Sequence, residues 1–429
     1  MLNIGQENSK YFFNKAIKTI KENTKSTITN PNYMSEGAKE EVNLPKNMIA
    51  LLHFGRSGTG FLHSLIDNHS EVSTLPSYYF NHFFNTSTWE DITKDGWDKM
   101  IDRFISNYEV FFDARVEKPS ASAASYVNNG YQGVKDGMTR LGENGKDFLF
   151  IDKKLFKKEL SELLSRYKEI DTLTFFKLIH IAYERVLNNK NKNTIFYHIH
   201  NPDDCGKLNF AGLANDTKWF LTIRDPVEGT ESWVAREFSD NNYKDVYIKS
   251  IATLRTINHP LFDENNAIGV RLDDLKQKPK ETMAALCDWM GIKEEDTLYE
   301  MTAQGKKWWG DHSTPFLPAF GKVDKRKLGK VFSKKDKFIL DTIYYPFRVK
   351  FNYTEENIEK FRKDLKTIRP MINEIFDFEK EIALKNNIDE KSFMISAFPC
   401  IFRTVLLNRW KILDKFNTYP NMLQPLQIL

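Results

Sequence analysis

The sequence alternates short apolar runs with longer stretches of helical periodicity. Four runs have the length and composition of strands buried on both faces of a sheet: 48–54, 194–200, 218–223 and 267–272. Helical patterns follow at about 60–66, 226–238 and 279–290. Strands that alternate with helices predict a parallel, doubly wound sheet, and ligands bind such sheets at the carboxyl ends of the strands.

The length of 429 residues leaves room for more than this sheet. We expect an N-terminal arm at 1–45, an α/β domain at 46–345 and a helical C-terminal extension at 346–429, irregular after Tyr419. Residues 76–193 interrupt the α/β pattern as a large helical insertion. Its many aromatic residues predict an apolar surface, and its run Phe148–Ile151 predicts a strand.

Composition excludes several classes of protein. The chain is 41% apolar and 28% charged, as soluble globular proteins are, and a net charge of +4 is too small and dispersed to favour nucleic acid. Cys205, Cys287 and Cys400 form neither a disulfide framework nor a zinc pattern, which favours a reducing, cytoplasmic location. We recognise no signal peptide and no apolar run of ~18 residues that would predict a transmembrane helix.

The first strand and the first helix are joined by a glycine-rich loop, Gly55-Arg56-Ser57-Gly58-Thr59-Gly60. Such a loop lets backbone N–H groups approach an anion, and the helix N-terminus adds its positive dipole end. Phe61-Leu62 replaces the Lys-Ser/Thr pair of nucleotide-hydrolysing loops, so the magnesium-binding hydroxyl is missing and the loop's cation is Arg56. The pattern predicts a P-loop NTPase-like α/β fold that binds phosphate without magnesium-dependent hydrolysis. The alternative is a plain glycine turn.

A second candidate element begins where the strand 218–223 ends. Arg224 follows that strand, and Ser232 comes eight residues later, two turns into the next helix. Asp225, Pro226 and Glu228 match the N-cap, N1 and N3 positions of a capping box. An arginine and a hydroxyl so placed can hold a second phosphate. The alternative is a structural salt bridge beside a small packing residue.

Together these segments resemble a known family. GRSGTGFLHSLIDNHSEV and WFLTIRDPVEGTESW are similar to the two nucleotide-binding signatures of sulfotransferases that use 3′-phosphoadenosine 5′-phosphosulfate (PAPS), and residues 270–292 resemble a third family segment. The resemblance implies that the loop binds the 5′-phosphosulfate and that Arg224 and Ser232 bind the 3′-phosphate. The residues it assigns to the first site are Arg56, Ser57, Gly58, Thr59, Gly60 and Phe61. It also implies that no metal is required and that 3′-phosphoadenosine 5′-phosphate (PAP) is the product.

The resemblance extends to a catalytic base. His200 matches the catalytic histidine of the cytosolic branch, and His198 stands where that branch has a lysine. Residues two apart on a strand share a face. The alternatives are hydrogen-bonded strand-end histidines or a His-x-His metal pair, although no third ligand is evident. Other branches use a glutamate after the phosphate helix, and the corresponding Thr74–Tyr79 has no carboxylate.

Two further residues resemble family positions. Lys153 resembles a lysine that could touch the sulfonate, but it could equally be a surface residue. Trp308, in the basic stretch 306–311, is a candidate for closing the adenine site, as is the stretch 321–330; Trp308 could also be a packing aromatic.

The function expected is transfer of a sulfuryl group from PAPS to a hydroxyl or amine of a small-molecule acceptor bound by the insertion. The alternatives are a non-catalytic PAP-binding or nucleotide-binding protein of the same fold, a carbohydrate sulfotransferase and an atypical kinase. Phe61-Leu62 counts against the kinase, because these residues replace the Lys-Ser/Thr pair. The acceptor and the oligomeric state cannot be derived from the sequence.

Overall fold

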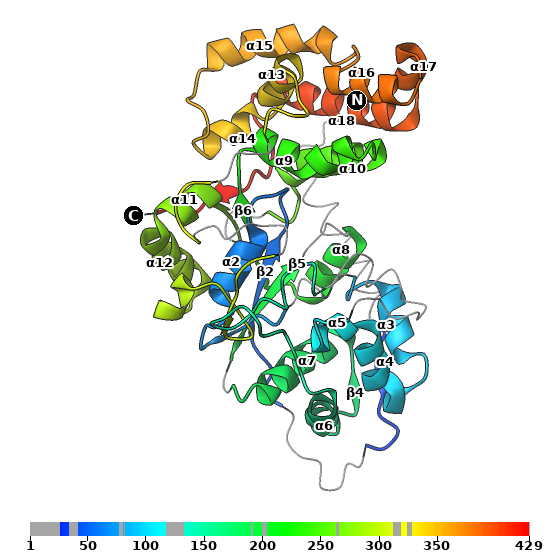
Figure 1. Ribbon diagram of the computed structural model, residues 1–429, viewed down its shortest axis with the longest axis vertical. Coiled ribbons are helices and arrows are strands. Elements are labelled where there is room, and N and C mark those ends of the chain that lie inside the picture. Colours follow the sequence, from blue (N-terminus) through cyan, green and yellow to red (C-terminus); the bar gives the residue numbers. More distant parts are fainter. Residues whose placement is uncertain are drawn as a thin grey trace.

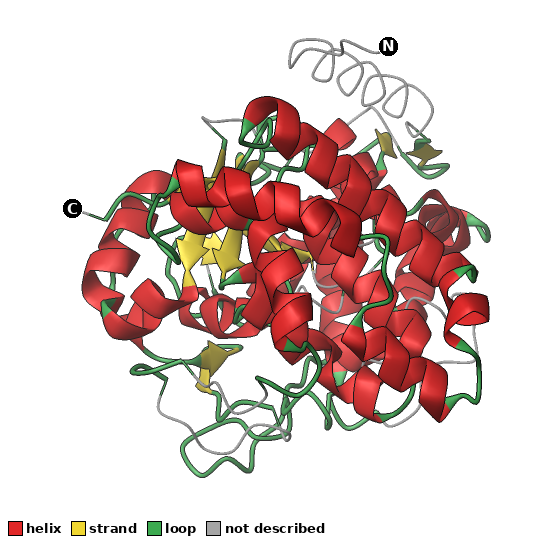
Figure 2. Ribbon diagram, turned by 90° about the horizontal axis from the view of Figure 1, so that it is seen from above, coloured by secondary structure: helices red, strands yellow, loops and turns green. Residues whose placement is uncertain are grey.

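The computed structural model describes residues 26–33, 42–76, 80, 82–116, 133–189, 192–199, 204–262, 266–311, 319–323 and 328–428. Its centre is a six-stranded sheet of order β10-β7-β6-β2-β5-β3, enclosed by helices (Figures 1 and 2). The strands are β2 (Asn47–Leu52), β3 (Val72–Ser73), β5 (Thr194–Ile199), β6 (Lys218–Ile223), β7 (Ala267–Arg271) and β10 (Gln424–Pro425). Every neighbouring pair is parallel, which confirms the predicted fold class.

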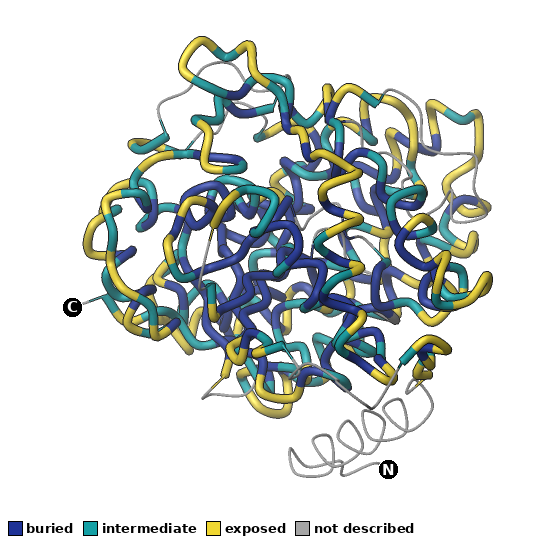
Figure 3. The backbone as a smooth tube through the Cα atoms, turned by 90° about the horizontal axis from the view of Figure 1, so that it is seen from below, coloured by how far each residue is buried: buried dark blue, intermediate teal, exposed yellow. Residues whose placement is uncertain are grey.

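The central strand β2 shows why these apolar runs form the sheet. Met48 to Leu52 are all buried. Ile49 and Leu51 contact a core formed with α2 (Thr59–Ile66), α11 (Leu272–Gln277) and α12 (Pro279–Met290). Met48, Ala50 and Leu52 face the opposite, larger core. Burial on both faces is the environment that continuous apolar strands require, and Figure 3 shows buried chain through the centre of the molecule.

The insertion forms a helical layer beside the sheet, low in Figure 1. Its helices are α3 (Thr86–Thr93), α4 (Met100–Asn107), α5 (Glu109–Phe112), α6 (Lys153–Leu164) and α7 (Thr172–Val186), with the 3₁₀ turn η2 (Trp97–Lys99). Several of the insertion's described aromatic side chains are buried and do not line a surface. Phe80, Phe83 and Phe84 are at most 3% exposed and pack on Phe176. These rings build the insertion's own core.

The strand predicted at Phe148–Ile151 is not formed. Phe150 makes a single antiparallel bridge to Asp113, and its side chain is 49% exposed. Asp152 ends this extended stretch because its carboxylate accepts the backbone N–H groups of Lys154 and Leu155 and caps α6. The prediction was wrong because an apolar run forms a strand only when a neighbouring strand pairs with it, and among the described residues this run has only the one bridge.

Two small antiparallel pairs flank the main sheet. β1 (Ile28–Thr29) pairs with β4 (Glu169–Ile170), and β8 (Thr302–Ala303) pairs with β9 (Lys306–Lys307). The 3₁₀ turn η3 (Asp296–Tyr299) lies between α12 and β8. The amphipathic helix expected at Tyr11–Glu22 falls outside the described residues.

The C-terminal extension is a helical bundle at the top of Figure 1, packed beside α9 (Pro226–Ser239) and α10 (Tyr243–Thr256). The bundle begins with α13 (Lys334–Ile343) and α14 (Tyr345–Lys350), which start before residue 346, and continues with α15 (Ile358–Met371), α16 (Asp377–Lys385), α17 (Glu390–Met394) and α18 (Ala397–Phe416). The chain then returns to the sheet, where β10 pairs with β7. The tail after Tyr419 is therefore not simply irregular. Within the described residues, no helix is long and apolar enough to cross a membrane.

Candidate functional site

The glycine-rich loop leaves β2 at the carboxyl edge of the sheet and enters α2. Gly55 and Gly58 have φ of 55° and 85°, in the left-handed region that glycine adopts without strain. Gly58 is the N-cap residue of α2, and a Cβ added to it would lie 2.7 Å from Leu272 Cδ1. A Cβ added to Gly60, in contrast, would meet no atom within 4 Å. The Gly60 side of the loop is therefore open, and Arg56 is exposed beside it.

Buried contacts fix the other side of the loop. Ser57 Oγ lies 3.2 Å from Thr222 Oγ1, and both side chains are fully buried. Thr59 is buried as well. A Cβ on Gly55 would lie 3.5 Å from the carbonyl carbon of Gly229, in the first turns of α9. The loop is thus held against both β6 and α9.

Arg224 and Ser232 lie on these same two elements. Arg224 follows β6 and is 6% exposed, and Ser232 is 9% exposed on α9. The Asp225 carboxylate accepts N–H groups from Val227 (3.0 Å) and Glu228 (3.1 Å), which confirms the predicted helix start with Pro226 as the first residue. The Glu228 carboxylate lies 3.6 Å from Arg224 Nη2.

Gly229 joins the two predicted anion-binding elements. It stands between Arg224 and Ser232 in the chain, and its carbonyl group is the one that Gly55 approaches. A Cβ on Gly229 would lie 3.9 Å from Arg224 Cβ. The structure therefore brings the glycine loop and the arginine–serine segment side by side at the carboxyl edge of β2 and β6, where parallel sheets bind ligands.

Two of the described histidines, His198 on β5 and His63 on α2, lie close together beside the loop's strand and helix. His198 on β5 is 1% exposed, and its ring centroid is 5.4 Å from that of His63 on α2. Burial lowers the pKa of His63 to about 4 against the smaller opposing effect of Asp67, so the ring is neutral at neutral pH. His200 lies outside the described residues, and its role as base stays a prediction. Sequence reasoning missed His63, although it stands one helical turn after Gly60.

Trp308 is brought close to α2. It shares a narrow crevice with Gly60 and His63, and it bridges to Leu141 of the insertion. The remaining lining residues are Ser64, Asp67, Pro76, Met138, Leu149, Thr302, Ala303 and Gln304. Asp67 fastens one wall, because its carboxylate accepts hydrogen bonds from Thr74 Oγ1 (3.0 Å) and from Gly305 N–H (2.9 Å).

Phe61 and Lys153 have other surroundings. The Phe61 ring contacts Phe320 at a centroid distance of 5.8 Å, and Lys276 Nζ lies 4.9 Å from its centroid. Lys153 is exposed at the first position of α6. Its recorded interaction is within the insertion, where Arg115 and, more weakly, Lys153 lower the pKa of Asp113. The structure records no contact that joins Lys153 to the described part of the glycine loop.

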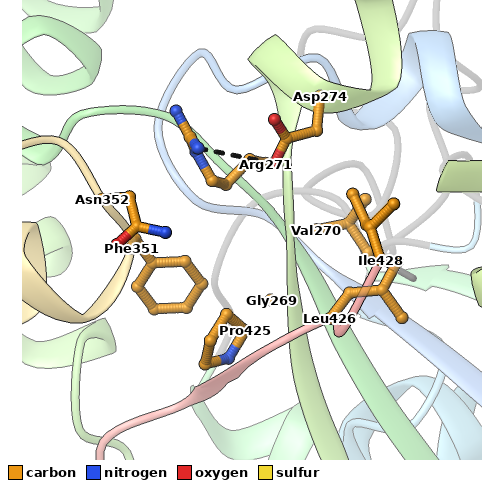
Figure 4. Close-up of a pocket in the computed structure, with 9 residues that line it drawn as sticks. All are labelled: Gly269, Val270, Arg271, Asp274, Phe351, Asn352, Pro425, Leu426 and Ile428. Carbon is orange, nitrogen blue, oxygen red and sulfur yellow. Dashed lines mark ion pairs between the residues drawn. The ribbon is translucent and has the colours of Figure 1, made fainter. Parts of the chain in front are cut away.

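A second pocket lies at the carboxyl end of β7 and is shown in Figure 4. Phe351 and Asn352, which directly follow α14, form one wall of this pocket, and the C-terminal tail forms another. Arg271 Nη1 is 3.5 Å from Asp274 Oδ2, and the Arg271 guanidinium carbon lies 4.9 Å from the centroid of Tyr353. The sequence did not single out this pocket, because the tail that completes it showed no strand pattern.

Among the described residues, no group of three or more His, Cys, Asp and Glu side chains is placed to hold a metal ion. Comparison with protein-family models gives no match, and no curated protein matches the chain. Among solved structures, the chain is similar to the sulfotransferase domain of the Synechococcus PCC 7002 olefin synthase, with 14% identity over 62% of this chain and 83% of that one and a TM-score of 0.36. A sulfotransferase domain from the curacin biosynthetic pathway gives 13% identity over 67% of this chain and 84% of that one, with a TM-score of 0.34. Likeness at this level carries no argument about function.

Proposed function

We propose that this protein is a PAPS-dependent sulfotransferase that acts on a hydroxyl or amine of a small molecule. The observation that carries the proposal is the close approach of the glycine loop to the α9 backbone. A Cβ added to Gly55 would lie only 3.5 Å from the carbonyl carbon of Gly229. This contact sets the two elements that we propose to bind anions beside each other, as a nucleotide with phosphates at both its 5′ and 3′ positions requires. A glycine turn with an unrelated salt bridge would not need this proximity.

In the proposed complex the loop amides at the start of α2, together with Arg56, face the 5′-phosphosulfate. Backbone N–H groups and an arginine can stabilise the charge that develops on the leaving phosphate. Arg224 and Ser232 hold the 3′-phosphate, and the 3.6 Å pair of Arg224 with Glu228 gives way to that contact. The buried Ser57 hydroxyl supports the loop through its contact with Thr222. The backbone N–H of Ser57 is proposed to donate to the ligand.

The proposed reaction breaks the bond between sulfur and the phosphate oxygen and forms a bond between sulfur and the acceptor. The acceptor proton passes to His200, and PAP leaves with the negative charge. A neutral imidazole with a pKa near ~6.5 suits this proton transfer at neutral pH. The resemblance of His198-Ile199-His200 to the family's strand supports the assignment.

The acceptor is proposed to enter between the insertion and the phosphate-loop helix. The crevice that Gly60 and His63 share with Met138, Leu149 and Trp308 supports this position. Its mainly apolar walls favour an acceptor with a small apolar or aromatic group beside the reacting atom. The His63 ring, which is neutral at neutral pH, adds no charge to this crevice.

The direct test of activity is incubation with PAPS and a panel of alcohols, phenols and amines, followed by mass spectrometry of the products. We expect a sulfuryl-group mass gain on at least one acceptor, with equal release of PAP and no requirement for magnesium. The Arg224→Met variant tests whether the activity depends on the proposed site, and it should lose turnover at limiting PAPS. Tight PAP binding without turnover on any acceptor class would favour the non-catalytic nucleotide-binding alternative.

A further inference from the structure

Arg348 of the C-terminal bundle contacts the 3′-phosphate side of the proposed site. Arg348 on α14 donates from Nε to Asp225 Oδ2 at 2.8 Å, and its Nη1 lies 2.8 Å from Asp341 Oδ1. Asp225 is only 9% exposed at this pair, and the Arg348 side chain is 21% exposed. Such a pair is more strongly coupled than an ion pair on the open surface.

Asp225 divides its two carboxylate oxygens between two tasks. Oδ1 accepts the N–H groups of Val227 and Glu228 and so caps α9, while Oδ2 accepts the Arg348 donor. A carboxylate held at both oxygens has one orientation. Arg224 directly precedes this residue, and Glu228 in the capped turn is the ion-pair partner of Arg224.

Further contacts tie the same corner to the C-terminal part of the chain. Tyr353 OH, just after α14, donates to the Ile223 carbonyl oxygen at 3.2 Å, which holds the residue before Arg224. Glu231, the neighbour of Ser232, is 1% exposed, and its Oε1 accepts N–H groups from Val331 and Phe332 at 3.1 Å. Lys337 Nζ on α13 lies 3.0 Å from Glu231 Oε2.

We infer that Arg348 is a positioning residue for the proposed 3′-phosphate site, acting through Asp225 on the turn that carries Arg224. The C-terminal bundle is then a part of the nucleotide site and not an appendage. Figure 4 shows the same convergence one strand further on, where Phe351 and Asn352 meet the end of β7 and the tail. This inference rests on the proposed function, since it assigns Arg224 a phosphate to hold.

The test compares Arg348→Met with Arg362→Met in the full-length protein. Arg362 lies in the same bundle and pairs with Asp414 at 3.7 Å, and both of these side chains are well exposed. The first measurement is the ratio of the Kd for AMP to the Kd for PAP by calorimetry without magnesium. We expect Arg348→Met to lower this ratio about tenfold through weaker PAP binding, with AMP affinity and the control variant unchanged. A merely structural arginine would weaken both nucleotides equally, and that result would overturn the inference.

The second measurement needs no nucleotide. Hydrogen exchange of the amides at 227–230 should be at least about tenfold faster in Arg348→Met than in Arg362→Met, because the cap of α9 loses its fixed orientation. Equal exchange in the two variants would overturn the inference. A third outcome separates the two claims. If exchange is faster in Arg348→Met but the wild-type protein does not distinguish PAP from AMP, the positioning role of Arg348 stands and the proposed function is rejected. If Arg348→Met does not fold, Arg348→Lys is measured in its place. The same changes in the Kd ratio and in the exchange rate are expected, but they should be smaller.

Discussion

At the scale of single residues, the glycine loop offers a clean separation of ligand binding from folding. Gly60 has open space where a Cβ would stand, whereas Gly58 has a φ of 85° and Leu272 in the way. The two glycines are two positions apart, so they form a matched pair. A loss of PAP affinity in Gly60→Ala would therefore show that a ligand approaches the loop from the solvent side.

We predict that Gly60→Ala leaves the melting temperature of the free protein within about 1 °C of wild type. It should weaken PAP binding about tenfold, because the new methyl group occupies the side where the phosphate approaches. Gly58→Ala should destabilise the free protein by ~1–2 kcal/mol, the cost of a left-handed alanine. Thermal melts and calorimetry measure both effects. Unchanged PAP affinity in Gly60→Ala would argue against a ligand on that face.

His200 provides a second prediction at this scale. With a saturating hydroxyl acceptor, His200→Ala should lower turnover by ~10²–10⁴-fold, because the acceptor proton loses its base. PAP affinity should stay within about twofold, since the base does not touch the 3′-phosphate. The wild-type rate should rise with pH through ~6.5, where the ring becomes neutral. Turnover close to wild type in the variant would refute the assignment. His198→Ala should instead lower stability, because that side chain is buried.

Among the secondary-structure elements, the junction of α13, α14 and α9 contains an unusual carboxyl group. Burial, with smaller contributions from Asp225 and Glu228, raises the pKa of Asp341 to about 6 against the opposing effects of Arg348 and Lys337. Its folded-state pKa is above the unfolded value of 3.8, so the protonated form favours folding. Stability from this group is full below about pH 4 and is lost as pH rises through about 6.

We therefore predict that Asp341→Asn raises the free energy of unfolding at pH 7.5 and has little effect near pH 4. The side chain is 40% exposed, so solvent screening limits the gain to ~1 kcal/mol or less. Thermal melts between pH 4 and 8 measure it, with Asp240→Asn on the exposed end of α9 as control. The wild-type loss of stability between pH 5 and 7 should be reduced in Asp341→Asn only. An unchanged pH dependence would show that Asp341 has no raised pKa.

The strands of the sheet were predictable because each is a continuous apolar run buried on both faces. The helix start at Asp225 was predictable because its cap is local in sequence. β10 was not, since Gln424 and Pro425 are a strand only by pairing with Ile268 and Gly269. The aromatic insertion was misjudged for a related reason. Aromatic composition shows that rings will pack, but only the fold decides whether they face one another or a ligand.

At the scale of the whole molecule, four distant segments meet at one edge of the sheet. The loop after β2 approaches α9 at Gly229 and the start of α11 at Leu272, and the C-terminal bundle reaches the turn after β6 through the bond of Arg348 to Asp225. The sequence predicted the first two and their chemistry. It could not predict Arg348, which is more than a hundred residues from Asp225 and stands in an ordinary helical pattern.

The central claim is that the loop and the Arg224–Ser232 segment form one site for a nucleotide with phosphates at its 5′ and 3′ positions. Calorimetry of PAP and of AMP, in buffer with a chelator of divalent ions, tests it most directly. We predict that PAP binds at least about tenfold more tightly than AMP, or ~1.4 kcal/mol. Ser232→Ala should reduce that difference while AMP affinity stays unchanged. Equal affinities of the wild-type protein for PAP and AMP would contradict the claim.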